Sequence, residues 1–102
     1  MDKIYITDSV IEKLILTSVS EVKEVKSLLN SRHVISGKMH GKNNLFVRNE
    51  NTININLQLI LQYGHNIPEL CLKIQERVRS GVENMSGLKA GKINIFVADI
   101  VQ

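Results

Sequence analysis

The clearest pattern in the chain is an alternation of apolar and polar side chains between residues 53 and 62. The apolar set is Ile53, Ile55, Leu57, Leu59 and Leu61, and the polar set is Asn54, Asn56, Gln58 and Gln62. A period of two predicts a strand with one buried face and one polar face. We therefore expect a sheet that is covered on one side only.

A helical repeat of apolar residues begins after Thr7 and Asp8, whose side-chain oxygens can cap a first turn. Its apolar positions are Val10, Ile11, Leu14, Ile15, Val19 and Val22. Val25, Leu28 and Leu29 follow, and they fit either a continuation of this helix or a separate turn.

A second helix is predicted from Asn66 to Ser86, with a length of about 30 Å. Asn66 and Glu69 have the spacing of a capping box, and Pro68 lies in the first turn, where it loses no helical hydrogen bond. Gly87 is suited to end the helix in a left-handed conformation. The buried stripe is predicted to be Ile67, Leu70, Cys71, Ile74, Val78, Val82 and Met85.

Three further segments favour extended backbone. Residues 4–6 form a short β-prone run, and residues 45–48 are expected to pair with the alternating strand as a hairpin. The turn between them, Asn49-Glu50-Asn51, suits a bend because Asn tolerates positive φ. Residues 92–101 form the last strand, with Ile93, Ile95, Val97 and Val101 on one face and Asn94, Phe96, Ala98 and Ile100 on the other.

The resulting order is β-α-β-β-α-β, which predicts an α+β fold with two helices packed on one face of a small mixed sheet. The 102 residues fit one domain, residues 1–102, and an apolar share of 43% is enough for a core. Residues 30–44 are rich in Ser, Gly and Asn, so we expect a flexible loop there.

The chain carries no recognisable targeting pattern. Its beginning lacks the apolar run of a signal peptide, and no stretch approaches the ~20 apolar residues of a membrane span. Cys71 is the single cysteine, which excludes an internal disulfide and suits a reducing cytoplasm. We therefore expect a cytoplasmic protein that reaches a membrane only through a partner.

The net charge of +3 is unevenly distributed. Between Glu24 and Glu50 there is no acidic residue, and this stretch contains Lys26, Arg32, Lys38, Lys42 and Arg48. One interpretation is an ordinary solvated region, and the other is a surface for an anionic partner.

Motifs for catalysis or for a cofactor are missing from the sequence. The spacings of a nucleophile elbow, a Walker loop, a dinucleotide fold and a zinc site are all absent. His33, His40 and His65 have no accompanying cluster of cysteines or carboxylates, and Cys71 falls on the apolar stripe of the second helix. We therefore expect neither an enzyme nor a cofactor or metal.

The C-terminal half carries a combination of motifs that resembles the alkaline shock protein family. These motifs are the strand Ile53-Asn54-Ile55-Asn56-Leu57, the step Gln62-Tyr63-Gly64, the helix start Asn66-Ile67-Pro68-Glu69, the helix end Met85-Ser86-Gly87-Leu88 and the strand Ile93-Asn94-Ile95-Phe96-Val97. Glu24 departs from the pattern, because the family usually has Gly there. The family also tends to have a longer Gly-rich stretch in place of residues 36–44.

The resemblance implies a non-catalytic role in envelope stress, exerted through self-association or through docking to a membrane-anchored partner. The candidate partner-binding residues are the exposed side of the second helix and the polar face of the sheet: Lys73, Gln75, Glu76, Arg77, Arg79, Asn54, Asn56 and Gln58.

A small RNA-binding protein is the alternative hypothesis. It would use the basic segment 26–48 and an element order that some RNA-binding sheets share. Against it, the strands lack adjacent exposed aromatic residues for base stacking, although Phe46 and Phe96 could point to either face.

Overall fold

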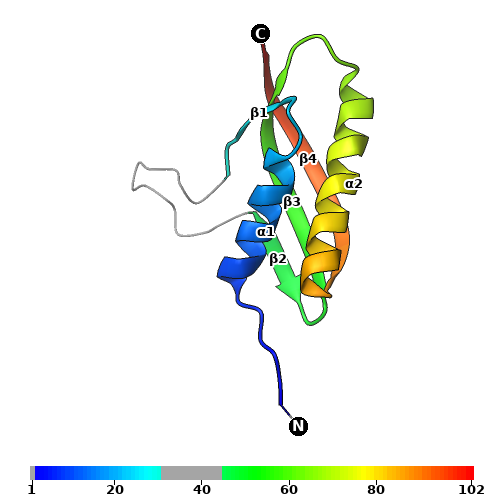
Figure 1. Cartoon of the computed structure of the whole chain (residues 1–102). Coiled ribbons are helices and arrows are strands. Elements are labelled where there is room, and N and C mark those ends of the chain that lie inside the picture. The colour runs from blue at the N-terminus through cyan, green and yellow to red at the C-terminus, as the bar shows by residue number, and fades with distance from the viewer. Residues whose placement is uncertain (1, 31–44) are drawn as a thin grey trace.

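The computed structural model describes residues 2–30 and 45–102. Two helices lie on the same face of a four-stranded sheet (Figure 1). The elements are α1 (Asp8–Ser20), β1 (Val25–Leu28), β2 (Phe46–Asn49), β3 (Thr52–Gln62), α2 (Ile67–Ser86) and β4 (Lys89–Val101). The predicted α+β class and the β2–β3 hairpin are confirmed.

Strand β3 is the centre of the sheet and is paired on both edges. β4 runs parallel to it along one edge, from Thr52 opposite Lys89 to Gln62 opposite Val101. β1 and β2 are antiparallel to β3 and share the other edge end to end. The sheet is therefore mixed, as predicted, and the outer side of β4 is one of its edges.

Asn30 fills the gap between β1 and β2 along this edge. Its side-chain amide donates to the carbonyl oxygen of Asn56 at 2.7 Å and accepts from the Gln58 N–H at 3.3 Å. On either side, the Leu29 N–H donates to the Gln58 carbonyl, and the Asn56 N–H donates to the Leu45 carbonyl. The side chain thus replaces a peptide group of the missing neighbouring strand.

The core lies between the two helices and the apolar face of β3. All five apolar residues of the predicted alternation are fully buried, and so are Ile11 and Ile15 of α1 and Ile74, Val78 and Val82 of α2. The apolar stripes predicted for the two helices each included one exposed terminal residue. Val10 of α1 is 46% exposed, and Met85 of α2 is 71% exposed. Both residues lie in terminal turns of their helices, where the packed layer ends.

The predicted first strand is wrong. Residues 4–6 precede α1 without forming a strand, and Ile4 is 90% exposed. The edges of β3 are occupied by β1, β2 and β4, and residues 4–6 pair with none of the four strands. The additional strand is β1, which follows α1 and uses Val25 and Leu28, so the order is α-β-β-β-α-β.

The ends of the elements mostly follow the expected local chemistry. Asn66 Oδ1 accepts from the Glu69 N–H at 3.0 Å, and Gly87 ends α2 with a φ of 78°. The β2–β3 turn differs from expectation, because the positive φ, 46°, belongs to Glu50 and not to an asparagine.

Candidate interaction surfaces

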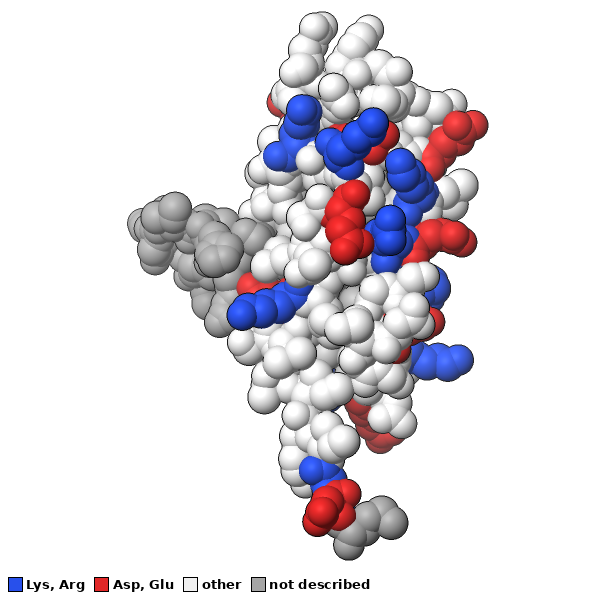
Figure 2. Space-filling view, viewed as in Figure 1, with Lys and Arg blue, Asp and Glu red and all other residues white. Residues whose placement is uncertain are grey.

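One flank of α2 is tied to the segment that follows α1. Lys73 Nζ lies 3.5 Å from Glu24 Oε1, and Arg77 lies 3.6 Å from Glu21 Oε1. Together with Glu76 and Ser80, Lys73 and Arg77 line a shallow depression on this side. Figure 2 shows acidic and basic side chains interspersed over the helical face, so neither sign forms a continuous patch.

Glu24 is the buried member of these ion pairs, with 8% of its surface exposed. A hydrogen bond from its own backbone lowers the pKa of this carboxyl, the Lys73 ammonium lowers it further, and desolvation opposes both. Within residues 2–30 and 45–102 Oε1 has no hydrogen-bond partner, and the charges of Lys73 and of Lys23 offset its burial. The carboxylate therefore fastens the α1–β1 connection to α2.

The other flank of α2 is bound to the outer edge of β4. Gln75 Nε2 donates to the Ile93 carbonyl at 2.9 Å, and Arg79 donates to the carbonyls of Ala90 and Gly91. Glu83 Oε2 accepts from the Ala90 N–H at 2.9 Å. Gln75 and Arg79, which sequence reasoning placed on one exposed side with Lys73 and Arg77, thus lie on the opposite flank from them.

The candidate residues Asn54, Asn56 and Gln58 lie on the sheet face that points away from the helices. Asn54 Oδ1 accepts from the Lys92 N–H at 2.8 Å, and Asn56 Oδ1 accepts from Asn94 Nδ2 at 3.1 Å. The prediction of one core face and one polar face is confirmed for β3. No helix of the described residues covers this polar face (Figure 1).

Two apolar side chains stand among these amides. Phe96, opposite Gln58 in β4, is 56% exposed, and Val47, opposite Asn54 in β2, is 55% exposed. Alternation within β4 placed Phe96 on this face, whereas Val47 could be assigned only with the hairpin register. Phe46 points the other way and packs against the core.

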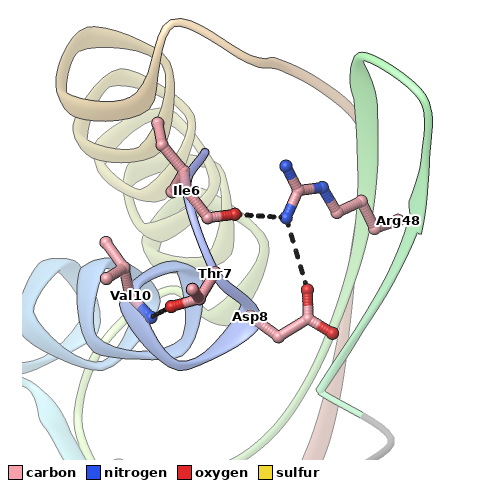
Figure 3. A network of polar contacts seen from close by, with 5 residues as sticks. All are labelled: Ile6, Thr7, Asp8, Val10 and Arg48. Atoms are coloured by element: carbon pink, nitrogen blue, oxygen red, sulfur yellow. Dashed lines mark hydrogen bonds and ion pairs between the residues drawn. The ribbon is translucent and has the colours of Figure 1, made fainter. Parts of the chain in front are cut away.

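The basic segment is described only at Lys26 and Arg48, because Arg32, Lys38 and Lys42 fall outside the described residues. Lys26 is exposed on β1. Arg48 is engaged at the start of α1, where its guanidinium donates to the Ile6 carbonyl at 2.6 Å and lies 3.4 Å from Asp8 Oδ1 (Figure 3). Arg48 therefore joins β2 to the chain before α1.

The histidines and Cys71 were the remaining candidates for metal binding or catalysis. His65 is exposed, and His33 and His40 lie in the part of the chain that is not described. Within residues 2–30 and 45–102, no three His, Cys, Asp or Glu residues come close enough to hold a metal ion. Cys71 packs against the core, as expected, and desolvation raises the pKa of its thiol.

Fold and surfaces together define a two-helix, mixed-sheet α+β protein in which one face of the sheet is open. The sequence pattern of the alkaline shock protein 23 family, described as having a cell envelope-related function, matches residues 1–102. The chain belongs to this family, which confirms the resemblance seen in its C-terminal half.

Two relatives are themselves uncharacterized. The protein YqhY of Bacillus subtilis (strain 168) is 29% identical over 98% of this chain and 78% of its own length. The protein Spy1614 of Streptococcus pyogenes serotype M6 is 35% identical over 47% of this chain, a match that spans only 40% of that protein. No solved structure matches the chain. Among the described residues, no helix is long and apolar enough to cross a membrane.

Proposed function

We propose that this protein serves the cell envelope without catalysis, by associating with itself or by docking to a membrane-anchored partner. The family's envelope-related function gives the setting. The observation that carries the proposal is the open sheet face, on which Phe96 and Val47 are each more than half exposed among amide side chains. Aromatic side chains are enriched in protein interfaces, whose rims are polar.

Affinity capture tests this proposal. A tagged copy is recovered from cells at low salt, divided into samples with and without nuclease, and its co-purifying proteins are identified by mass spectrometry. We expect a membrane protein, or further copies of this chain, to be recovered whether or not nuclease is present. Phe96→Asp should reduce that recovery, and Ser80→Asp, on the helical face, is the matched control.

Two results would contradict the proposal. Nuclease-sensitive recovery of RNA-bound proteins would move the function to nucleic acid, where salt should weaken binding steeply. Equal recovery by wild type and Phe96→Asp would remove the open sheet face from the interface. Circular dichroism of each variant confirms that lost recovery is not lost folding.

A further inference from the structure

Charged side chains are scarce on the open sheet face. The residues that point there from β3 are all uncharged: Thr52, Asn54, Asn56, Gln58, Ile60 and Gln62. The charged residues of β4 that lie beside them are Lys89, Lys92 and Asp99. The helical face, by contrast, carries many side chains of both signs (Figure 2). Depletion of charge around an exposed aromatic residue is typical of the centre of a protein interface.

Lys92 and Asp99 lie toward opposite ends of this face. Lys92 lies in a bulge beside Asn54, and its N–H donates to Asn54 Oδ1 at 2.8 Å, whereas Asp99 pairs with Ile60. Both side chains are exposed, and neither forms an ion pair within residues 2–30 and 45–102. The levels of Asn54 and Ile60 are separated by about 20 Å along β3, so the two charges are too far apart to pair within one copy.

The two charges are related by the symmetry of the face. Their midpoint is the level of Leu57, which is also the middle of β3. A two-fold axis that crosses the strands at this level places Lys92 of each copy opposite Asp99 of the other, with the β4 strands antiparallel. If the β4 strands were parallel and in register, like charges would meet instead. The charges of the open sheet face therefore complement those of a second copy in one orientation.

We propose that the open sheet face binds a second copy of this chain in a two-fold, face-to-face dimer, in which Lys92 of each copy pairs with Asp99 of the other. The inference names the partner for the open sheet face, so it rests on the proposed function. Packed sheets lie about 10 Å apart. The helices of both copies would form the outer layers of the dimer, because they cover the other face of each sheet (Figure 1).

The same axis brings exposed apolar side chains together. Phe96 lies at the level of Gln58, one residue beyond the axis, so the two Phe96 side chains are about 7 Å apart along the strands. Aromatic rings make favourable offset contacts at such separations. Val47 lies at the level of Asn54, which the axis places opposite the level of Ile60.

The size of the face predicts the strength of the dimer. A sheet three strands wide over the length of β3 provides roughly 500 Å² on each copy, or roughly 1,000 Å² in all. This area is near the lower limit of specific interfaces, so we expect a reversible dimer that dissociates on dilution. Lys89 lies at the end of the face and Lys26 on the edge strand β1, where long side chains can keep their ammonium groups in water.

Sedimentation equilibrium of the full chain, from micromolar to millimolar concentration, tests this dimer. Lys92→Glu and Asp99→Lys each replace two attractive pairs by two repulsive ones, so each should weaken the dimer by about tenfold. An equimolar mixture of the two variants should restore it, because each substituted side chain then meets one of opposite charge and the native pair also forms. Lys13→Glu makes the same charge change on the exposed side of α1 and should leave the dimer unaltered.

A general effect of net charge gives a different result. The two variants change the net charge in opposite directions, so such an effect would weaken the dimer in one and strengthen it in the other. That outcome, a mixture no stronger than either variant alone, or equal weakening by Lys13→Glu would overturn the proposal. Amide NMR of wild type on dilution should shift the signals of Asn94 and Phe96, and shifts confined to α2 would also overturn it.

Capture from cells separates this inference from the proposed function. If a membrane protein is recovered by wild type and lost with Phe96→Asp while the purified chain stays monomeric, the proposed function stands and the dimer is refuted. If mixing the variants restores the dimer while capture yields only RNA-bound proteins that nuclease releases, the dimer stands and the proposed function fails.

Discussion

Gly81 lets helices α1 and α2 approach each other closely, and its replacement by alanine gives a sharp test of the fold. A Cβ atom at this position would lie 2.0 Å from Ser18 Oγ and 3.2 Å from Ser18 Cβ. Ser18 is only 5% exposed and belongs to the buried side of α1. We therefore expect Gly81→Ala to destabilise the protein, although alanine is the better helix former.

Two opposing contributions set the size of this effect. Alanine in place of glycine within a helix stabilises it by roughly 0.5–1 kcal/mol. Forcing an extra methyl group into a packed contact costs typically about 1–3 kcal/mol. Rotation of Ser18 about χ1 can move Oγ away, but the 3.2 Å contact with Ser18 Cβ remains, so the packing cost should prevail. We expect a net loss of about 1–2 kcal/mol, at roughly 4–8 °C in Tm for each kcal/mol.

Urea unfolding followed by circular dichroism measures the free energy of unfolding of four chains: wild type, Gly81→Ala, Ser18→Ala and the double variant. Ser18→Ala removes Oγ, so the two substitutions should couple favourably by about 1 kcal/mol. Gly87→Ala is the control, because Gly87 has a φ of 78° with open space around it, and its cost should not depend on Ser18. A more stable Gly81→Ala, or strict additivity with Ser18→Ala, would refute the close helix contact.

Three further predictions concern the turn, the core and acid stability. Glu50→Gly should raise the free energy of unfolding by about 0.5–1 kcal/mol, because it relieves a positive φ of 46° in a hairpin turn; a lower urea midpoint would contradict this. Val78→Asp should abolish the cooperative transition, since an unpaired charge would replace a fully buried side chain; a folded variant would place Val78 outside the core. Glu24 has a pKa below 4.5 in the folded protein, so its contribution to stability is present above that pH and is lost as the pH falls through the folded pKa. Glu24→Gln should therefore lose less stability than wild type between about pH 5 and pH 3, and an equal loss would show that other groups control the acid transition.

Sequence reasoning recovered the elements whose hydrophobic period is long and uninterrupted. The alternation of β3 and the capped stripe of α2 each extend over many residues, so their buried faces could be assigned from the chain alone. The strand β1 has four residues, which is too few for period two to be told from a helical spacing. Its existence depends on the free edge of β3, which is a tertiary property.

The irregular pairing of β3 with β4 also limited what could be predicted from the sequence. The register between β3 and β4 shifts between Leu59 and Ile60, so Ile100 pairs with the core residue Leu61 and Val101 pairs with Gln62. The alternation predicted for β4 is therefore correct up to Val97 and wrong beyond it. Period two assumes an unbroken ladder, and a bulge exchanges the faces after it.

The prediction of partner-binding residues on α2 was limited in a similar way. A helical wheel identifies which side chains of α2 face outward, but it does not reveal that Gln75 and Arg79 find carbonyl partners on β4. Those partners lie more than ten residues away in sequence, and their positions depend on how α2 packs beside β4.

The amide of Asn30 has a consequence for how this domain can be altered. This one side chain bonds to the main chain of β3 at both Asn56 and Gln58, so it continues the hydrogen-bond ladder of β3 between β1 and β2. The position between β1 and β2 is therefore a natural insertion point, where a tag, a reporter or a binding peptide can be grafted while the sheet keeps its register. Replacing Asn30 with alanine would remove that tolerance, since the Asn56 carbonyl and the Gln58 N–H would both lose the partner that Asn30 supplies.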